Sequence, residues 1–232
     1  MAKYKALLID DNTQFTESVK GYLLSQDRFS EVDTAQDGRE ALKKLREKTY
    51  DVMTLDLKQV TAGLRKPFAV VANIPYYITT PLIRLLLESG LEISRLALMV
   101  QQEVADKILA EPGDEAWCPL SVLCRFLCEP ELAVKVPAEM FTPPPKVDSA
   151  FVVLPLREKP AVDVKDREMF FRVANAAFAL RRKTMVNNLC ATFRAERSQA
   201  LEWLQAAGLD EKIRGEKLTL EEIAALADAI DR

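Results

Sequence analysis

The chain has 232 residues and a formal net charge of −3, with charged and apolar fractions that are ordinary for a globular protein. This length predicts one large or two small domains, and the charge argues against a generally basic nucleic-acid binder while allowing a local basic face. The chain contains no histidine, which excludes Cys/His zinc sites and histidine-based acid–base catalysis.

The four cysteines form no Cys-x-x-Cys pair. We therefore expect free thiols and a cytoplasmic location. The N-terminus lacks the apolar segment of a signal peptide, and no apolar run reaches membrane-spanning length, so we expect no membrane partner. The oligomeric state does not follow from the composition.

Short apolar runs alternate with helical patterns in the first quarter of the chain. Strands are predicted over residues 5–9, 30–35 and 51–56, and helices over residues 13–25 and 38–48. A β-α-β-α-β series predicts a parallel sheet whose strands end at a common edge. Asp10, Asp11 and Asp56 follow or close these strands, and clustered carboxylates become tolerable around a divalent cation. We therefore expect these three aspartates to bind Mg²⁺ weakly.

Three patterns in this segment resemble the first half of a response-regulator receiver domain, over residues 8–11, 35–38 and 50–57. The resemblance implies that Asp56 is a phosphoacceptor and that Asp10 and Asp11 hold Mg²⁺. A receiver also needs a Ser or Thr after its fourth strand and a Lys after its fifth. Here the next two predicted strands end in Asn73 and Gln101, so these parts of a receiver are missing.

The stretch after residue 67 is an apolar, β-branched run that predicts a buried strand over residues 68–72, followed by Asn73. Pro75 cannot donate to a strand ladder, so the strand ends before it. Ligands of open α/β sheets bind at such strand ends. The Asn73 amide offers a donor and an acceptor, and the Tyr76 ring offers a stacking face, so together they suit a planar heterocycle with an exocyclic amine.

Several spaced segments resemble the ribosomal RNA adenine N6-dimethyltransferase family in the family's own order, at residues 73–82, 98–105, 119–123 and 141–150. The resemblance implies that Asn73, Pro75 and Tyr76 bind the target amine and that Phe141 stacks on the adenine. It also implies S-adenosylmethionine as the methyl donor.

Beyond residue 160 helices are predicted over residues 166–193, 195–207 and 219–229. Arg181, Arg182 and Lys183 form a basic cluster within the first of them. A solvated helix face is the usual explanation of three charges. A similar stretch of the dimethyltransferase family lies in a small helical domain that meets RNA, so the resemblance implies contact with ribosomal RNA phosphates.

The pattern expected for S-adenosylmethionine is absent from the sequence. The chain has no Gly-x-Gly for close backbone approach, and two carboxylates after the first strand would repel the carboxylate of the methionyl group. Asp33 or Asp37 are the only candidates for the acid that binds the ribose, and their context does not support that role. We therefore predict that no cofactor-binding site is intact.

These patterns lead to a hybrid interpretation with a doubly wound, mostly parallel α/β fold. A flavodoxin-like, receiver-derived half (1–57) is joined to a Rossmann-like methyltransferase half (64–158), and a small RNA-contacting helical domain follows (159–232). We expect one continuous sheet of strand order 2-1-3-4-5-7-6. The hypothesis is an engineered chimera without a complete cofactor site and without activity. The alternatives are an S-adenosylmethionine-dependent ribosomal RNA adenine N6-dimethyltransferase, an Mg²⁺-binding phosphoacceptor module and a passive RNA-binding module.

Overall fold

The computed structural model divides the chain into two compact units, Met1–Arg65 and Lys66–Arg232. Each unit is described by itself below. The structure describes residues 4–9, 13–25, 29–36, 40, 43–44, 47–48, 52–55, 66–74, 76–180 and 182–230.

The first unit contains a parallel three-stranded sheet. Its strands are β1 (Tyr4–Ile9), β2 (Phe29–Ala35) and β3 (Val52–Leu55), in the order β2-β1-β3, and α1 (Thr13–Ser25) connects β1 to β2. The apolar strand residues Ala6, Leu8 and Val32 form a buried cluster, against which Leu23 of α1 and Phe29 pack. Leu7 between them is also 0% exposed, so β1 is buried on both faces, as a continuous apolar run in a parallel sheet requires.

The second unit is built on a mixed four-stranded sheet. Its strands are β4 (Phe68–Asn73), β5 (Ile93–Gln101), β6 (Glu131–Val136) and β7 (Ser149–Pro155), in the order β4-β5-β7-β6. The β4–β5 pair is parallel, whereas β5–β7 and β7–β6 are antiparallel. The helices of this part are η1 (Tyr76–Ile78), α4 (Thr79–Glu88), α5 (Gln102–Leu109), α6 (Pro119–Leu127) and η2 (Ala138–Met140).

The strand orders within the two sheets agree with the predicted orders 2-1-3 and 4-5-7-6. The described strands form two sheets, one in each unit, and the pairing of residues 51–57 with residues 68–72 that would make them one sheet stays a prediction. The expectation of a mostly parallel sheet is also wrong for the second unit, because β7 runs antiparallel to both of its neighbours. The chain therefore has an α/β fold with a mixed sheet.

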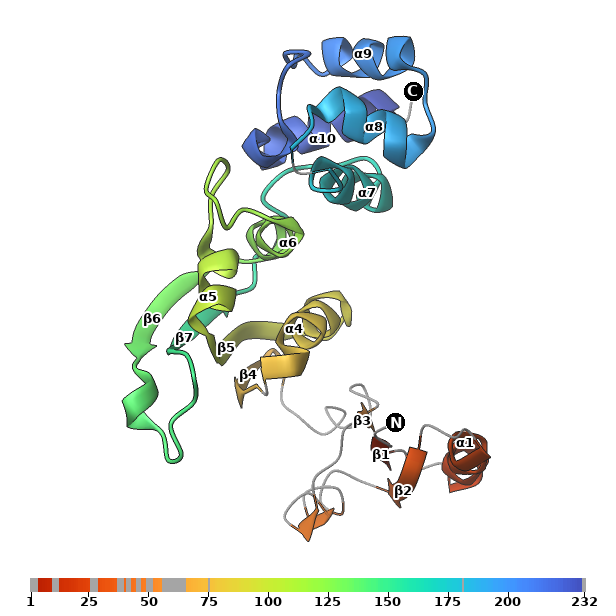
Figure 1. Ribbon diagram of the computed structural model, residues 1–232, viewed down its shortest axis with the longest axis vertical. Coiled ribbons are helices and arrows are strands. Elements are labelled where there is room, and N and C mark those ends of the chain that lie inside the picture. The colour runs from red at the N-terminus through yellow and green to blue at the C-terminus, as the bar shows by residue number, and fades with distance from the viewer. Residues whose placement is uncertain are drawn as a thin grey trace. The chain divides into compact units, whose positions relative to one another are not determined.

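Four helices follow β7 and share one hydrophobic core with α6 (Figure 1). They are α7 (Arg167–Ala177), α8 (Met185–Phe193), α9 (Arg197–Ala206) and α10 (Leu220–Ile230), with η3 (Gly215–Lys217) before the last. The stacked rings of Phe126 in α6 and Phe170 in α7, with centroids 4.7 Å apart, lie at the junction of these helices. The predicted domain boundary between residues 158 and 159 stays a prediction.

The helices α7 and α8 replace the single helix predicted over residues 166–193. The periodicity continues through residues 178–184, but the buried side chain of Asn188 bonds to the backbone there. Its Oδ1 accepts from the Leu180 N–H at 3.0 Å, and its Nδ2 donates to the Ala177 carbonyl at 3.0 Å. These tertiary bonds end α7 and hold a turn in place. A capping box stands at the start of α10, where the Thr219 N–H donates to the Glu222 carboxylate and the Glu222 N–H donates to the Thr219 hydroxyl.

Candidate functional site

The carboxyl end of β4 carries the first residue of the predicted base-binding set. Asn73 is the last residue of β4, where it pairs with Met99 of β5, and its side chain is exposed. Ile74 is buried and donates its N–H to the Met99 carbonyl at 3.3 Å, which anchors the chain as it leaves the sheet. The short helix η1 then begins at Tyr76. Pro75 lies outside the described residues.

An open hollow lies beside this strand end, with about 580 Å³ of empty space. Asn73, Ile74 and Tyr76 line one part of it, and three residues of the loop between η2 and β7, Phe141, Pro143 and Pro145, line the rest. The structure thus brings Asn73, Tyr76 and Phe141 together from segments far apart in the sequence. Their assignment to an adenine site stays a prediction.

Ser149 is a residue of this site that sequence reasoning did not assign. It is the first residue of β7, it is 0% exposed, and its hydroxyl lies 2.8 Å from the Tyr76 hydroxyl. The sequence already contained a hint, because a serine closes the motif that begins at Phe141. Its partner could not be predicted, because Tyr76 lies on a different segment.

The residue before Ser149 contacts the loop that carries Phe141. The Ala138 N–H donates to Oδ1 of Asp148 at 2.9 Å, and the Phe141 N–H donates to the Ala138 carbonyl at 3.2 Å. The Asp148 carbonyl in turn accepts from the N–H of Gln102, the first residue of α5, at 3.0 Å. The loop on the far side of the hollow is therefore tied to the start of β7.

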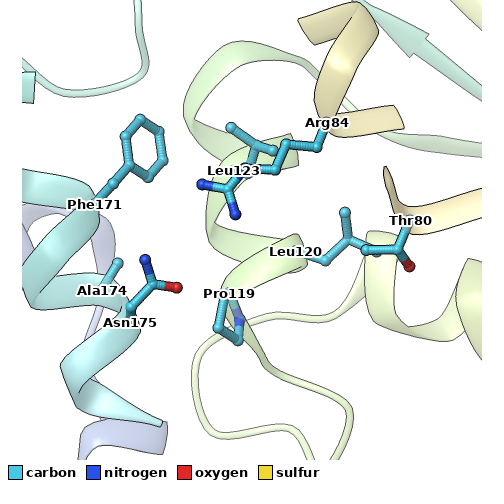
Figure 2. Close-up of a pocket in the computed structure, with 8 residues that line it drawn as sticks. All are labelled: Thr80, Arg84, Pro119, Leu120, Leu123, Phe171, Ala174 and Asn175. Carbon is cyan, nitrogen blue, oxygen red and sulfur yellow. The ribbon is translucent and has the colours of Figure 1, made fainter. Parts of the chain in front are cut away.

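A second, more enclosed hollow of about 430 Å³ lies between α4, α6 and α7. Figure 2 shows the Arg84 side chain extending from α4 across Leu123 of α6 toward Phe171 and Asn175 of α7. The Arg84 Nε is already paired with Glu88, 3.1 Å away on the same helix. The lining is mostly apolar, and its one cation is paired, so the structure does not favour a particular ligand here.

Comparison with known proteins places this site in a family. A family model described as ribosomal RNA adenine dimethylase matches residues 33–232. The chain belongs to the ribosomal RNA adenine dimethylase family. It is 42% identical over 186 residues to ribosomal RNA small subunit methyltransferase A of Streptococcus sanguinis, a match that covers 78% of this chain and 64% of the relative. The protein of the same name from Moorella thermoacetica is 39% identical over 211 residues, covering 88% of this chain and 72% of that protein.

The chain thus spans about 64% of the length of the first relatives that it matches. Solved structures agree with the fold. A dimethyladenosine transferase from Plasmodium falciparum has a TM-score of 0.61 at 23% identity, covering 97% of this chain and 89% of that one. The 23S rRNA methyltransferase ErmE has a TM-score of 0.54 at 25% identity, covering 100% of this chain and 93% of that one.

Membership of the dimethylase family overturns the chimera interpretation. The family match begins at residue 33, well inside the segment that the sequence assigned to a receiver domain, and it continues through the predicted junction at residues 57–64. A receiver-derived, flavodoxin-like half and an engineered hybrid are therefore wrong. The error has a physical cause, because short strands ending in acids and joined by helices are common to doubly wound folds of every family.

The residues predicted to bind Mg²⁺ all lie outside the described residues; they are Asp10, Asp11 and Asp56. The predicted role of Asp56 as a phosphoacceptor is therefore untested as well. Within the part of the dimethylase-family chain that the structure describes, no group of three or more His, Cys, Asp or Glu residues could hold a metal ion. The metal prediction is therefore untested.

Arg182 and Lys183 of the basic cluster lie between α7 and α8, whereas the sequence had predicted a helix there. Arg182 and Lys183 are exposed there, and the Lys183 N–H donates to the Leu180 carbonyl at 2.9 Å. Arg181 lies outside the described residues. An exposed turn leaves both described cations free to reach a polyanion.

All four cysteines are free thiols. Burial raises the pKa of the Cys128 thiol to about 12 and raises the pKa of the Cys124 thiol well above its usual value, so both stay protonated and unreactive at neutral pH. Among the described helices, none is long and apolar enough to cross a membrane.

Proposed function

We propose that the chain is an S-adenosylmethionine-dependent ribosomal RNA adenine N6-dimethyltransferase. The observation that carries the proposal is the hollow at the end of β4, where an exposed amide, Asn73, meets two aromatic rings, Tyr76 and Phe141. An enzyme that modifies a base must take it out of its stack and hold it by its edge and its faces. Family membership supports adenine as the base.

In this proposal each side chain has a distinct task. The Asn73 side-chain carbonyl accepts a hydrogen bond from the exocyclic amine of the adenine, which orients the nitrogen that is to be methylated. Tyr76 and Phe141 offer their ring faces to the base, and stacking on an aromatic ring is worth about 1–3 kcal/mol per base. Pro75 joins this set by resemblance. The bound cofactor would supply the methyl group.

The described residues do not show which groups would hold the cofactor. The chain has no Gly-x-Gly, and residues 10–12, which follow β1 in the sequence, lie outside the described residues. Asp33 was a candidate for the ribose acid, but its carboxylate lies 3.1 Å from Nζ of Lys48. Lys48 also contacts Glu31 and lowers the pKa of that carboxyl. Asp37 lies outside the described residues. We propose that the cofactor half departs from the glycine-rich form, with weak S-adenosylmethionine binding as the consequence.

We propose that residues 159–232 form the RNA-contacting part and that Arg182 and Lys183 bind RNA phosphates. The free thiols and the expected RNA partner are the basis for a proposed cytoplasmic location. Replacing Lys183 with Ala is expected to lower the slope of log affinity against log salt for small-subunit RNA by about one. The matched control is Lys107→Ala on α5, whose ammonium is already paired with Glu103 at 2.6 Å. An unchanged slope for Lys183→Ala would remove this turn from the RNA interface.

The test of the activity is transfer of labelled methyl groups from S-adenosylmethionine to small-subunit RNA, with calorimetry of cofactor binding alongside. Turnover is expected in the native chain at high cofactor concentration. Asn73→Ala is expected to lower it at least about 100-fold, because an unoriented amine loses the positioning on which the reaction depends. The control is Asn187→Ala, an exposed asparagine on α8. Absence of turnover at saturating cofactor, or equal turnover in both variants, would refute the proposal.

A further inference from the structure

The two aromatic walls of the base-binding hollow come from different segments, and neither lies on a strand of the sheet. Tyr76 is in the short helix η1, and Phe141 follows the short helix η2. Single-turn helices hold few internal hydrogen bonds, so these segments need outside contacts to stay in one place. Both find such contacts at the same point of the fold, at Ser149, where β7 begins, and at Asp148 immediately before it.

The first contact is between two hydroxyls. The Ser149 hydroxyl, fully buried, lies 2.8 Å from the hydroxyl at the tip of the half-buried Tyr76 ring. A phenol held at its tip can no longer swing about the χ1 torsion, so the bond fixes the position of the ring. A buried hydroxyl that lost this partner would stay without one, which strengthens the coupling.

The second contact runs through one backbone group. The Asp148 carboxylate accepts from the Ala138 N–H, and the Ala138 carbonyl accepts from the Phe141 N–H. The Asp148 carboxylate therefore orients the short helix whose end carries Phe141. This bond is an outside contact for a loop that is otherwise mostly exposed.

Asp148 and Ser149 are themselves held in place by the sheet and by α5. The strand β7 lies between β5 and β6 in the sheet, and Ser149 pairs with Gln101 on one side and Val136 on the other. The Asp148 carbonyl is bonded to α5 through Gln102. Ser149, the first residue of a central strand, and Asp148, the residue before it, thus contact two otherwise weakly held segments.

We propose that Asp148 and Ser149 are positioning residues that set the spacing between the Tyr76 and Phe141 rings and so prepare the hollow to accept an unpaired base. This inference rests on the proposed function, because it assigns the hollow to a nucleobase. Neither residue touches the base. Ser149 acts through Tyr76, and Asp148 acts through Ala138 on Phe141.

The experiment measures stacking directly and needs no methyl donor. The probe is a small-subunit RNA fragment with 2-aminopurine at one unpaired position, whose fluorescence falls when the base stacks on an aromatic ring. Loss of one hydrogen bond changes an equilibrium about five-fold, so Ser149→Ala and Tyr76→Phe are each expected to weaken probe stacking about five-fold. The double variant is expected to be no weaker than either single variant, because both remove the same bond.

Asp148 is tested by a pair of variants that differ in one property. Asp148→Ala removes the acceptor of the Ala138 N–H and is expected to weaken stacking about five-fold. Asp148→Asn keeps a carbonyl oxygen at that place and is expected to stay within about two-fold of the native chain. A merely structural role would lower the melting temperature of Asp148→Ala without this rescue pattern in stacking.

The matched control is Ser94→Ala. The Ser94 hydroxyl also bonds across the same sheet, to the Phe68 carbonyl at 3.1 Å, but it lies outside the hollow. Additive losses of about 25-fold in the double variant, or an equal loss in Ser94→Ala, would overturn the inference. So would a native chain that fails to quench the probe. Methyl transfer is measured on the same proteins, because coupled stacking without turnover would refute the proposed function and leave the positioning role standing.

Discussion

Asn188 is the side chain whose removal tests the account of the C-terminal helices most sharply. It is 0% exposed on α8, and its amide bonds twice to the turn after α7, through Leu180 and Ala177. The change to test is Asn188→Ala. It deletes both bonds, leaves one backbone N–H and one carbonyl without their partner, and retains the helix, since alanine is the best helix former.

The expected loss follows from the burial of the two groups. A buried backbone group left without a partner loses about 1–3 kcal/mol. The Ala177 carbonyl belongs at the upper end of this range, because the backbone of Gly215 covers it so closely that an added Cβ there would lie 1.9 Å from its oxygen. The Leu180 N–H is only partly buried and belongs at the lower end. Together they predict a loss of about 3 kcal/mol of unfolding free energy.

Thermal and urea unfolding measure this loss. For a chain of this size about 1 kcal/mol lowers the melting temperature by 2–4 °C, so Asn188→Ala is expected to melt about 6–12 °C below the native chain. Asn187→Ala is the control, because its neighbouring, exposed amide bonds only to the Thr184 hydroxyl at 2.9 Å. The control is expected to stay within about 0.5 kcal/mol of the native chain. Equal melting temperatures for the two variants would show that Asn188 does not hold the turn.

Two glycine substitutions are expected to act in opposite directions. Gly215→Ala would place a Cβ 1.9 Å from the oxygen of Ala177 and is expected to destabilise the chain by about 3 kcal/mol or more. Gly21→Ala in α1, where nothing lies within 4 Å of the added Cβ, is expected to stabilise its helix by about 0.5–1 kcal/mol. Urea unfolding measures both changes. The thiols of Cys124 and Cys128 are expected not to react with a disulfide reagent at pH 8 in the native chain and to react once it is unfolded. Because the Cys128 thiol stays protonated up to about pH 12 in the folded state while an unfolded thiol ionises near pH 9, stability is expected to fall as the pH rises through this window. Rapid native-state labelling of both thiols would contradict the burial that raises their pKa values.

The family and most of the second unit could be predicted from the sequence. Spaced motifs that begin at Asn73 and Phe141 occur in the family's order, and the family match confirms the resemblance over residues 64–232. The strand order 4-5-7-6 was also predicted correctly. These successes have a common basis, because strands with strong β-branched runs and a strand end fixed by proline depend little on distant contacts.

The first quarter of the chain was assigned to the wrong family. Short runs of three or four residues around Asp10, residue 35 and Asp56 carried that assignment. Each run marks a strand end followed by a helix, and every parallel α/β fold requires such junctions. The predicted strand order 2-1-3 is nevertheless present, which shows that the local patterns determine the arrangement without determining the ancestry.

Polar side chains that bond to groups distant in the sequence explain the remaining differences. Asn188 bonds to Leu180 across eight residues and to Ala177 across eleven, and the Ser149 hydroxyl meets the Tyr76 hydroxyl across 73 residues. Neither partner can be predicted from periodicity, because hydrophobic patterns locate the core and say nothing about which buried polar groups pair within it. Most polar groups that are buried in a fold have a hydrogen-bond partner, but the sequence alone does not identify that partner. In this chain two such residues define the two places where function is proposed, the aromatic hollow and the basic turn, since each fixes a segment that neither helix nor sheet would hold.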